Sequence, residues 1–355
     1  MPRTARYVCA VLALVVSPAV VRGAAVRDHL YGVKALSASE AWAVGNFGSI
    51  YHTTNGGTSW EQKESNTKLP LFSVDFGDAR QGWAVGKSAM ILHTADGGAT
   101  WKTQKSPLPA DKHLFKVDAV DAKTAWAVGD WGAVVVTHDG GEHWDDRSLG
   151  TITVQVEQTA DRNAATVTDD IILYDVAFPD AQHGYMAGEF GTVLGTSDGG
   201  STWWRRDTGT DKTLFGLYFT DADHGWAVGI DGVIIRTHDG GRTWTFQRGE
   251  AQVEALDDVG FLAMIKNPGL YAVKVEGNRG IVVGDVGVLL TSTDGGETWN
   301  RLELPEKDRL VWMRDVSLVP GSGGFAVGAN GFSATVGQTD IRLPDGEKAH
   351  DTGTH

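Results

Sequence analysis

The stretch GWAVGKSAMILHTADGGATW, residues 82–101, recurs with small changes along the chain and decides the fold. Residues 184–203 are GYMAGEFGTVLGTSDGGSTW, and residues 225–244 are GWAVGIDGVIIRTHDGGRTW. The glycines that end each AVG-like phrase are Gly45, Gly86, Gly129, Gly188, Gly229, Gly284 and Gly328. Their spacing is 41 to 44 residues, apart from two longer intervals of 59 and 55 residues. A period of about 40 to 45 residues is typical of one four-stranded propeller blade.

Short strand patterns follow one another in a fixed order within each unit. In the second unit they are LFSVDF (71–76), GWAVG (82–86), MILHT (90–94) and TWKTQ (100–104), separated by glycine and aspartate. No segment of helical length shows a 3.6-residue period, and 46 glycines argue against helical repeats. We therefore predict an all-β, seven-bladed propeller of four-stranded antiparallel blades, whose neighbouring sheets cover one another.

The second half of the phrase predicts a turn between the third and fourth strands of six blades. Its Asp or Asn can accept hydrogen bonds from the N–H groups of its own turn, and its paired glycines can adopt conformations closed to other residues. A tryptophan then anchors the fourth strand through apolar burial. The six turns carry Asn55, Asp96, Asp139, Asp198, Asp239 and Asp294, followed by Trp60, Trp101, Trp144, Trp203, Trp244 and Trp299.

The two ends of the chain differ from the repeats. Residues 1–23 place Arg3 and Arg6 before an apolar run and small residues, which predicts a cleaved secretory signal. The run is about 15 residues long, short of the roughly 20 that an uncleaved membrane anchor needs. We assign residues 24–344 to the propeller and residues 345–355 to a polar, disordered tail. The seventh unit lacks the Asp-containing turn, so its outer strand is either residues 339–344 or the mature N-terminus near residues 24–28.

Charge and cysteine content exclude several classes of function. The formal charge is −14, and it becomes −17 without the signal, with 28 basic against 45 acidic residues. Such a surface disfavours nucleic acid and anionic membranes. Cys9, the sole cysteine, lies in the signal, which rules out disulfides and cysteine catalysis in the mature chain. The repeated histidines fall on separate blades, so we expect no metal and no cofactor, and we expect a monomer without a transmembrane segment.

The turns between second and third strands vary while the strands around them do not. They share one face of the propeller with the crossings between blades, where both long insertions fall, at about residues 148–170 and 249–268. We define the recognition ring as the candidate binding residues in these turns. They are Asn46, Phe47, Lys87, Asp130, Trp131, Glu189, Phe190, Asp231, Asp285 and Asn330. Aromatic and acidic side chains together suit a protein or peptide partner better than a phosphate ligand, although they could also only pack against neighbouring loops.

The repeat resembles the Asp-box, or BNR, family. The pairing of its turn with the GWAVG and LFSVDF strands is still more similar to the photosystem II stability and assembly factor family, over residues 29 to about 337. The resemblance implies an exported, non-catalytic propeller that binds a membrane protein complex or its subunits during assembly. It also implies a location in the thylakoid lumen of a photosynthetic host, and otherwise in the periplasm or outside the cell. Photosynthetic members carry an arginine-rich patch on such turns, and this chain has no arginine there.

Two alternatives stay open at this stage. One is a secreted glycosidase, sialidase-like or otherwise, or a carbohydrate-binding propeller, in which Asp130, Glu189, Asp231 and Asp285 would meet around the axis. No sialidase arginine triad, His-Glu-x-x-His motif or nucleophile elbow accompanies them, so we expect no enzymatic activity. The other is a periplasmic accessory protein of an envelope exporter.

Overall fold

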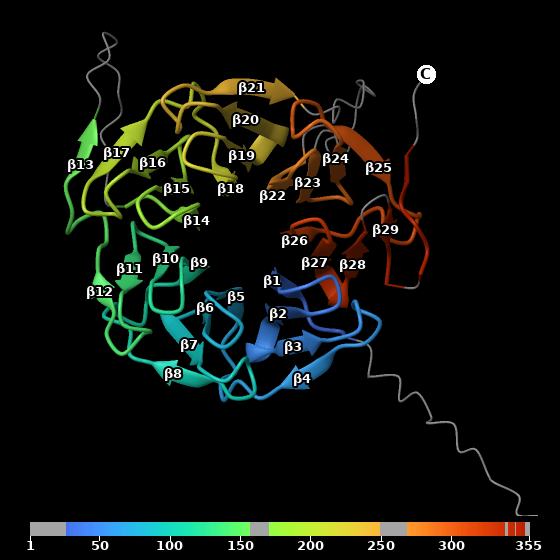
Figure 1. Ribbon diagram of the computed structural model, residues 1–355, viewed down its shortest axis with the longest axis horizontal. Coiled ribbons are helices and arrows are strands. Elements are labelled where there is room, and N and C mark those ends of the chain that lie inside the picture. The colour runs from blue at the N-terminus through green and yellow to red at the C-terminus, as the bar shows by residue number, and fades with distance from the viewer. Residues whose placement is uncertain (1–25, 157–169, 249–267, 338–339, 345, 352–355) are drawn as a thin grey trace, which may run out of the picture.

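Seven twisted sheets surround a central axis (Figure 1). The computed structural model describes residues 26–156, 170–248, 268–337, 340–344 and 346–351. In each blade four antiparallel strands follow one another in sequence order, and the first strand lies nearest the axis. The predicted all-β, seven-bladed propeller is confirmed. In the part of the chain that the structure describes, no helix is long and apolar enough to cross a membrane.

Strand bounds repeat from blade to blade. Blades 1 to 3 contain β1 (Leu30–Ala35), β2 (Ala41–Gly45), β3 (Ile50–Thr53), β4 (Glu61–Lys63), β5 (Leu71–Phe76), β6 (Gly82–Gly86), β7 (Met90–Thr94), β8 (Lys102–Gln104), β9 (Leu114–Ala119), β10 (Ala125–Gly129), β11 (Val134–Thr137) and β12 (Asp145–Asp146). Blades 4 and 5 contain β14 (Leu173–Ala177), β15 (Gly184–Gly188), β16 (Val193–Thr196), β17 (Trp203–Arg206), β18 (Leu214–Phe219), β19 (Gly225–Gly229), β20 (Val233–Thr237) and β21 (Thr245–Arg248). Blades 6 and 7 contain β22 (Leu270–Glu276), β23 (Arg279–Gly284), β24 (Leu289–Ser292), β25 (Asn300–Glu303), β26 (Met313–Val319), β27 (Gly323–Gly328), β28 (Ser333–Val336) and β29 (Ile341–Arg342). Three short 3₁₀ turns, η1 (Asn46–Gly48), η2 (Ile230–Gly232) and η3 (Ala329–Gly331), follow second strands.

The hydrophobic core lies between blades. Each of seven buried clusters joins residues of two neighbouring sheets, because one small sheet cannot cover both of its faces. Between blades 1 and 2, for example, Trp42 packs on Trp101 at a ring separation of 5.9 Å. Five of the six turn tryptophans are buried, and Trp244 is half-buried. The shared clusters therefore make the closed ring the stable unit.

The ring closes without exchange of strands between the chain ends. Strand β29 pairs with β28 and completes blade 7, so residues 341–342 supply the outer strand and the N-terminus does not. Blade 7 meets blade 1 through side chains, with Phe325 and Val327 packed against Leu30. The predicted signal, residues 1–23, lies outside the described residues.

Two further strands extend the outer edges of blades. Strand β13 (Val154–Val156) pairs parallel to β17, so this described part of the first insertion lies along blade 4 rather than over the face that carries the inner turns. Strand β30 (His350–Asp351) pairs antiparallel to β25. The expectation of a disordered tail therefore does not hold for residues 346–351, because backbone groups of the exposed edge of β25 offer them hydrogen-bond partners. Residues 157–169 and 249–267 of the insertions are outside the described part.

Side-chain hydrogen bonds hold the repeated turn between third and fourth strands. In blade 2 the Thr94 hydroxyl donates to Asp96 Oδ1 at 2.8 Å and accepts from Gly98 N at 2.8 Å. Asp96 also accepts from the hydroxyl and backbone N–H of Thr100 at 2.6 and 2.8 Å. These bonds favour the charged carboxylate and lower the pKa of Asp96 to about 2. The turn thus satisfies its polar groups with hydrogen bonds of its own.

Candidate functional site

The turns after the second strands place all members of the recognition ring on one face of the propeller. In each of the seven turns the second residue has a positive φ, for example 56° at Phe47, 55° at Trp131 and 54° at Phe190. Side chains larger than glycine adopt this conformation at a cost of roughly 1 kcal/mol or more. It turns these three aromatic rings outward, where they are 69%, 56% and 65% exposed.

The first residues of the turns have a different role. Asn46 accepts a hydrogen bond from the Tyr31 hydroxyl at 2.8 Å, and Asp285 accepts one from the Tyr271 hydroxyl at 2.7 Å. Asp130 and Glu189 accept from backbone N–H groups of the adjoining chain segments, at His113 and Ile172, whereas Lys87, also the first residue of its turn, is exposed. Four residues of the predicted ring therefore fasten their turns to the blades, and the other six are exposed.

The other three ring residues are exposed. Asp231 pairs with Lys212 at 3.0 Å on the surface. Lys87 and Asn330 extend into solvent, and the backbone N–H of Asn330 donates to His29 Nδ1.

Below the turns lies a cavity of about 340 Å³ at the axis, which we call the aromatic cavity. Six of its lining side chains come from the second position of a first strand, one from each of blades 1 to 6. They are Tyr31, Phe72, Phe115, Tyr174, Phe215 and Tyr271. Consecutive rings in this series are 4.9 to 5.9 Å apart, so they form an arc of aromatic contacts.

Blade 7 closes the arc with a different residue type. Arg314 occupies the equivalent position, and its guanidinium lies 4.3 Å from the Tyr271 ring centre. Trp312, just before β26, stacks on Tyr31 at 5.8 Å. The mouth of the channel is thus ringed by aromatic faces and one cation.

A backbone irregularity explains why these side chains face the axis. The pairing of first and second strands shifts register at the second position in all seven blades, as between Leu71 and Ser73. Such a β-bulge adds one residue to a strand and re-aims its side chain. Simple alternation would place Phe72 with Val74 and Phe76, which are buried between blades. The sequence analysis did not predict the cavity, because it assumed simple alternation along the first strands. The signal that could have revealed it is the Leu-Phe or Leu-Tyr pair that begins six of the first strands.

The floor of the aromatic cavity is an ion pair across the channel. Lys116 of blade 3 reaches Asp315 of blade 7, with Nζ 3.3 Å from Oδ1. Burial alone would lower the pKa of Lys116, but Asp315 and Asp175 outweigh burial, and its pKa is raised. The lysine is therefore charged, and the pair separates the aromatic cavity from a second, more polar space of about 180 Å³, the lower chamber.

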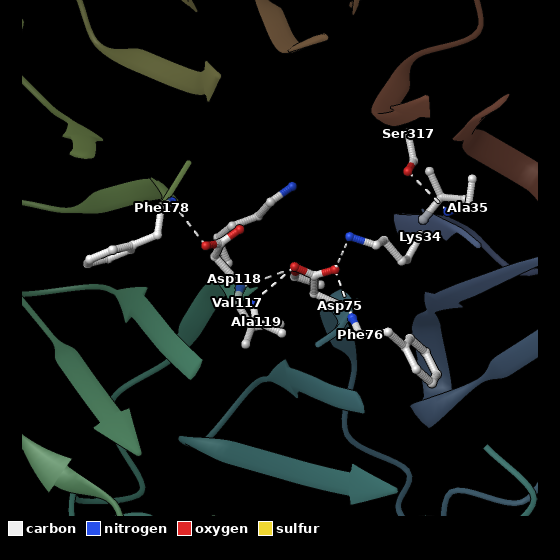
Figure 2. A network of polar contacts seen from close by, with 12 residues as sticks. Lys34, Ala35, Asp75, Phe76, Val117, Asp118, Ala119, Phe178 and Ser317 are labelled. Carbon is white, nitrogen blue, oxygen red and sulfur yellow. Dashed lines mark hydrogen bonds and ion pairs between the residues drawn. The ribbon is translucent and has the colours of Figure 1, made fainter. Parts of the chain in front are cut away.

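Acidic and hydroxyl side chains around the channel join neighbouring blades at four of the seven junctions, and Figure 2 shows part of this network. In four cases a carboxylate of one first strand accepts the backbone N–H of the next blade: Asp75 from Ala119, Asp118 from Phe178, Asp175 from Leu217, and Asp315 from Val33. Ser73 and Ser317 do the same for Val117 and Ala35. Most charges in the channel therefore have a structural partner.

Asp118 is the carboxylate of the lower chamber that has no basic side chain beside it. Lys34 pairs with the neighbouring Asp75 at 2.5 Å, and no basic side chain of the described residues lies within 4.0 Å of Asp118. Burial and the Asp75 charge raise the pKa of Asp118 to about 7. Lys274 faces the same chamber over the Tyr218 ring at 4.4 Å, and burial lowers its pKa. The charge of the lower chamber therefore depends on the protonation of Asp118 and Lys274.

The molecule is a seven-bladed β-propeller whose variable turns surround an aromatic cavity at the axis, which defines a scaffold with one candidate binding face. The profile of the family described as "Photosynthesis system II assembly factor YCF48" matches residues 23–168, 154–212 and 204–310, and the chain belongs to that family. No curated protein sequence matches the chain.

Solved structures share the fold. The one titled "YCF48 bound to D1 peptide" is 19% identical, with a TM-score of 0.66 over 88% of this chain and 94% of that chain. YCF48 from Cyanidioschyzon merolae is also 19% identical, with a TM-score of 0.66 over 88% of this chain and 96% of that chain. A GH74 xyloglucanase from Xanthomonas campestris is 15% identical, with a TM-score of 0.66, and this chain matches 53% of it over 89% of its own length. At these identities the likeness concerns the fold alone.

Proposed function

We propose that this protein is a non-catalytic scaffold that binds an extended segment of a membrane protein subunit while that subunit is assembled. The observation that carries the proposal is the face of the propeller on which Phe47, Trp131 and Phe190 project around the aromatic cavity. Exposed aromatic side chains on a rigid frame are typical anchors for a protein partner. Family membership supports the role in assembly, and the D1 peptide on a relative supports a peptide ligand.

The contacts of the turn acids support a role without catalysis. A glycosidase needs two carboxyl groups facing a substrate across a cleft, one of them a proton donor. Here Asp130 and Glu189 accept backbone N–H groups, and Asp285 accepts a tyrosine hydroxyl. Asp231 pairs with Lys212 at the surface. Each of the four carboxylates therefore already has a partner outside its turn.

We further propose that the chain acts outside the cytoplasm as a monomer. The charged start, apolar run and small residues of 1–23 support export, and the lack of cysteine in the mature sequence suits an exported chain that does not depend on disulfides.

A peptide array tests the binding proposal. It would cover D1 and the exported segments of the host's other membrane proteins, and would be probed with the purified mature protein. We expect discrete peptides to bind, and Trp131→Ser together with Phe190→Ser to abolish their binding. The matched control is Phe246→Ser, because Phe246 is 51% exposed on the outer strand of blade 5. Equal binding by all three proteins, or turnover of xyloglucan or aryl glycosides, would count against the proposal.

A further inference from the structure

Arg314 interrupts the aromatic series at the mouth of the channel. Six blades supply a Phe or Tyr at the second position of the first strand, and the seventh supplies this arginine. Its guanidinium carbon lies 4.3 Å from the Tyr271 ring centre and 6.0 Å from that of Phe215. A guanidinium stacked on an aromatic face keeps N–H donors at its edge available to a ligand.

The carboxylates around the aromatic cavity are engaged with other groups. Asp315 accepts Val33 N and pairs with Lys116, and Asp175 accepts Leu217 N. Asp285 accepts the Tyr271 hydroxyl. Among the described residues, no carboxylate lies within 4.0 Å of the Arg314 guanidinium. The cavity therefore contains a half-buried cation that has no carboxylate within ion-pair distance among the described residues.

The floor of the cavity limits the shape of a ligand. Because Lys116 and Asp315 join across the channel, a chain cannot thread through it. A volume of about 340 Å³ is near the lower end of ligand pockets, which span roughly 300 to 1,000 Å³. The space suits one or two residues that enter from the turn face and stop there.

We propose that the aromatic cavity binds a carboxylate carried next to an apolar side chain, with the carboxylate on Arg314 and the apolar group among the aromatic rings. This inference rests on the proposed function, since it names the chemistry of the peptide that the face receives. A C-terminal carboxylate and an internal Asp or Glu side chain offer the same chemistry. An arginine with a carboxylate forms the stronger, charge-assisted kind of hydrogen bond.

Calorimetric titration of the mature protein with three short peptides tests the proposal and separates the two sources. The probes are acetyl-Gly-Ser-Gly-Phe as a free acid, the same peptide as an amide, and acetyl-Gly-Ser-Asp-Phe as an amide. We expect the free acid to bind at least tenfold more tightly than the plain amide. Tighter binding of the Asp-containing amide than of the plain amide would identify a side-chain carboxylate as an accepted source.

Two variants locate the effect at Arg314. Arg314→Gln should remove the preference for the acid, and Arg314→Lys should retain part of it, because the charge remains while the planar fork is lost. Arg80→Gln removes the same charge from the opposite face, where Arg80 Nε donates to Ala95 O, and should change affinity less than twofold. Circular dichroism would show that each variant is folded.

Three results would overturn the inference: equal affinity for acid and amide, an acid preference that survives Arg314→Gln, or no binding of any probe. The proposed function fails separately, through loss of the Trp131 and Phe190 dependence on the peptide array.

Discussion

Lys116 and Asp315, 199 positions apart in the sequence, form an ion pair across the channel, with Nζ 3.3 Å from Oδ1. Blades 3 and 7 thus touch at the axis as well as through their neighbours. The same Asp315 carboxylate holds blade 1 through Val33 N. One carboxylate therefore links three blades at the floor of the candidate site.

Loss of the cross-channel cation should destabilise the whole ring. Lys116→Met leaves Asp315 in the channel without its counter-charge, and breaking one partner of a buried pair typically costs about 3 to 5 kcal/mol. We expect a clear fall in the urea midpoint. Lys63→Met is the matched control, because Lys63 pairs with the exposed Glu61 at the outer edge of blade 1. Exposed pairs contribute about 0 to 1 kcal/mol. Equal urea midpoints for the two variants would show that the cross-channel pair contributes nothing to the stability of the fold.

Protonation of Asp118 should make stability depend on pH. Its pKa is raised to about 7 in the folded protein, against about 3.9 in an unfolded chain. The folded state then binds this proton more tightly, so the free energy of unfolding falls as pH rises from about 4 to about 7. Asp118→Asn should remove this part of the slope and stabilise the protein at pH 8. Denaturation curves across this range measure it, with Asp145→Asn on the outer strand β12 as control. A slope that is unchanged in Asp118→Asn would refute the assignment.

The carboxylate of the repeated turn should show the opposite pH dependence. The pKa of Asp96 is lowered to about 2 by hydrogen bonds from Thr100 and Thr94, so its stabilisation is present above about pH 4 and is lost as pH falls toward 2. Blade 1 carries Asn55 here, whose Oδ1 accepts from Thr53 and Ser59 N. We therefore expect Asp96→Asn to retain most of the stability at pH 7 and Asp96→Ala to lose more, as measured by melting temperature. Equal losses of melting temperature in the two variants would mean that hydrogen bonds to the side-chain oxygen do not stabilise the turn.

Relief of backbone strain at a turn tip should separate stability from binding. Phe47 has a φ of 56° and an exposed ring, so its side chain contributes little to the core. Phe47→Gly should leave stability unchanged or raise it by about 0.5 to 1 kcal/mol, because glycine adopts this conformation freely. The same change should weaken peptide binding if the ring is an anchor. Thermal unfolding and the peptide array measure the two effects. Loss of stability with unchanged binding would indicate that Phe47 is structural.

The second glycine of the repeated turn should tolerate no side chain. Gly98 has a φ of 84°, and a Cβ there would come within 2.2 Å of the Trp42 ring of blade 1. Gly98→Ala therefore combines backbone strain with a clash in an inter-blade cluster, and we expect a loss above about 2 kcal/mol. Gly209→Ala isolates the backbone contribution, because Gly209 has a φ of 68° and no atom lies within 4 Å of the added Cβ. Similar losses of stability at the two positions would show that the Trp42 ring moves away from the added Cβ at little cost in free energy.

The sequence by itself determined the repeat, the strand order within a blade and the face on which the variable turns lie. These features depend on local patterns: the GWAVG strands, the Asp-containing turns with two glycines, and a period that matches one blade. It also left open which end of the chain completes blade 7, because residues near both termini could pair with β28. The structure shows that β29 is the outer strand of blade 7.

The tertiary structure alone decided the interior of the candidate site. The bulge at the second position changes the phase of each first strand, so residues such as Phe72 face the axis rather than the space between blades. Ring closure then brings Lys116 to Asp315 and places Arg314 against Tyr271. No local pattern encodes these contacts, because they depend on how seven separately formed sheets share one axis.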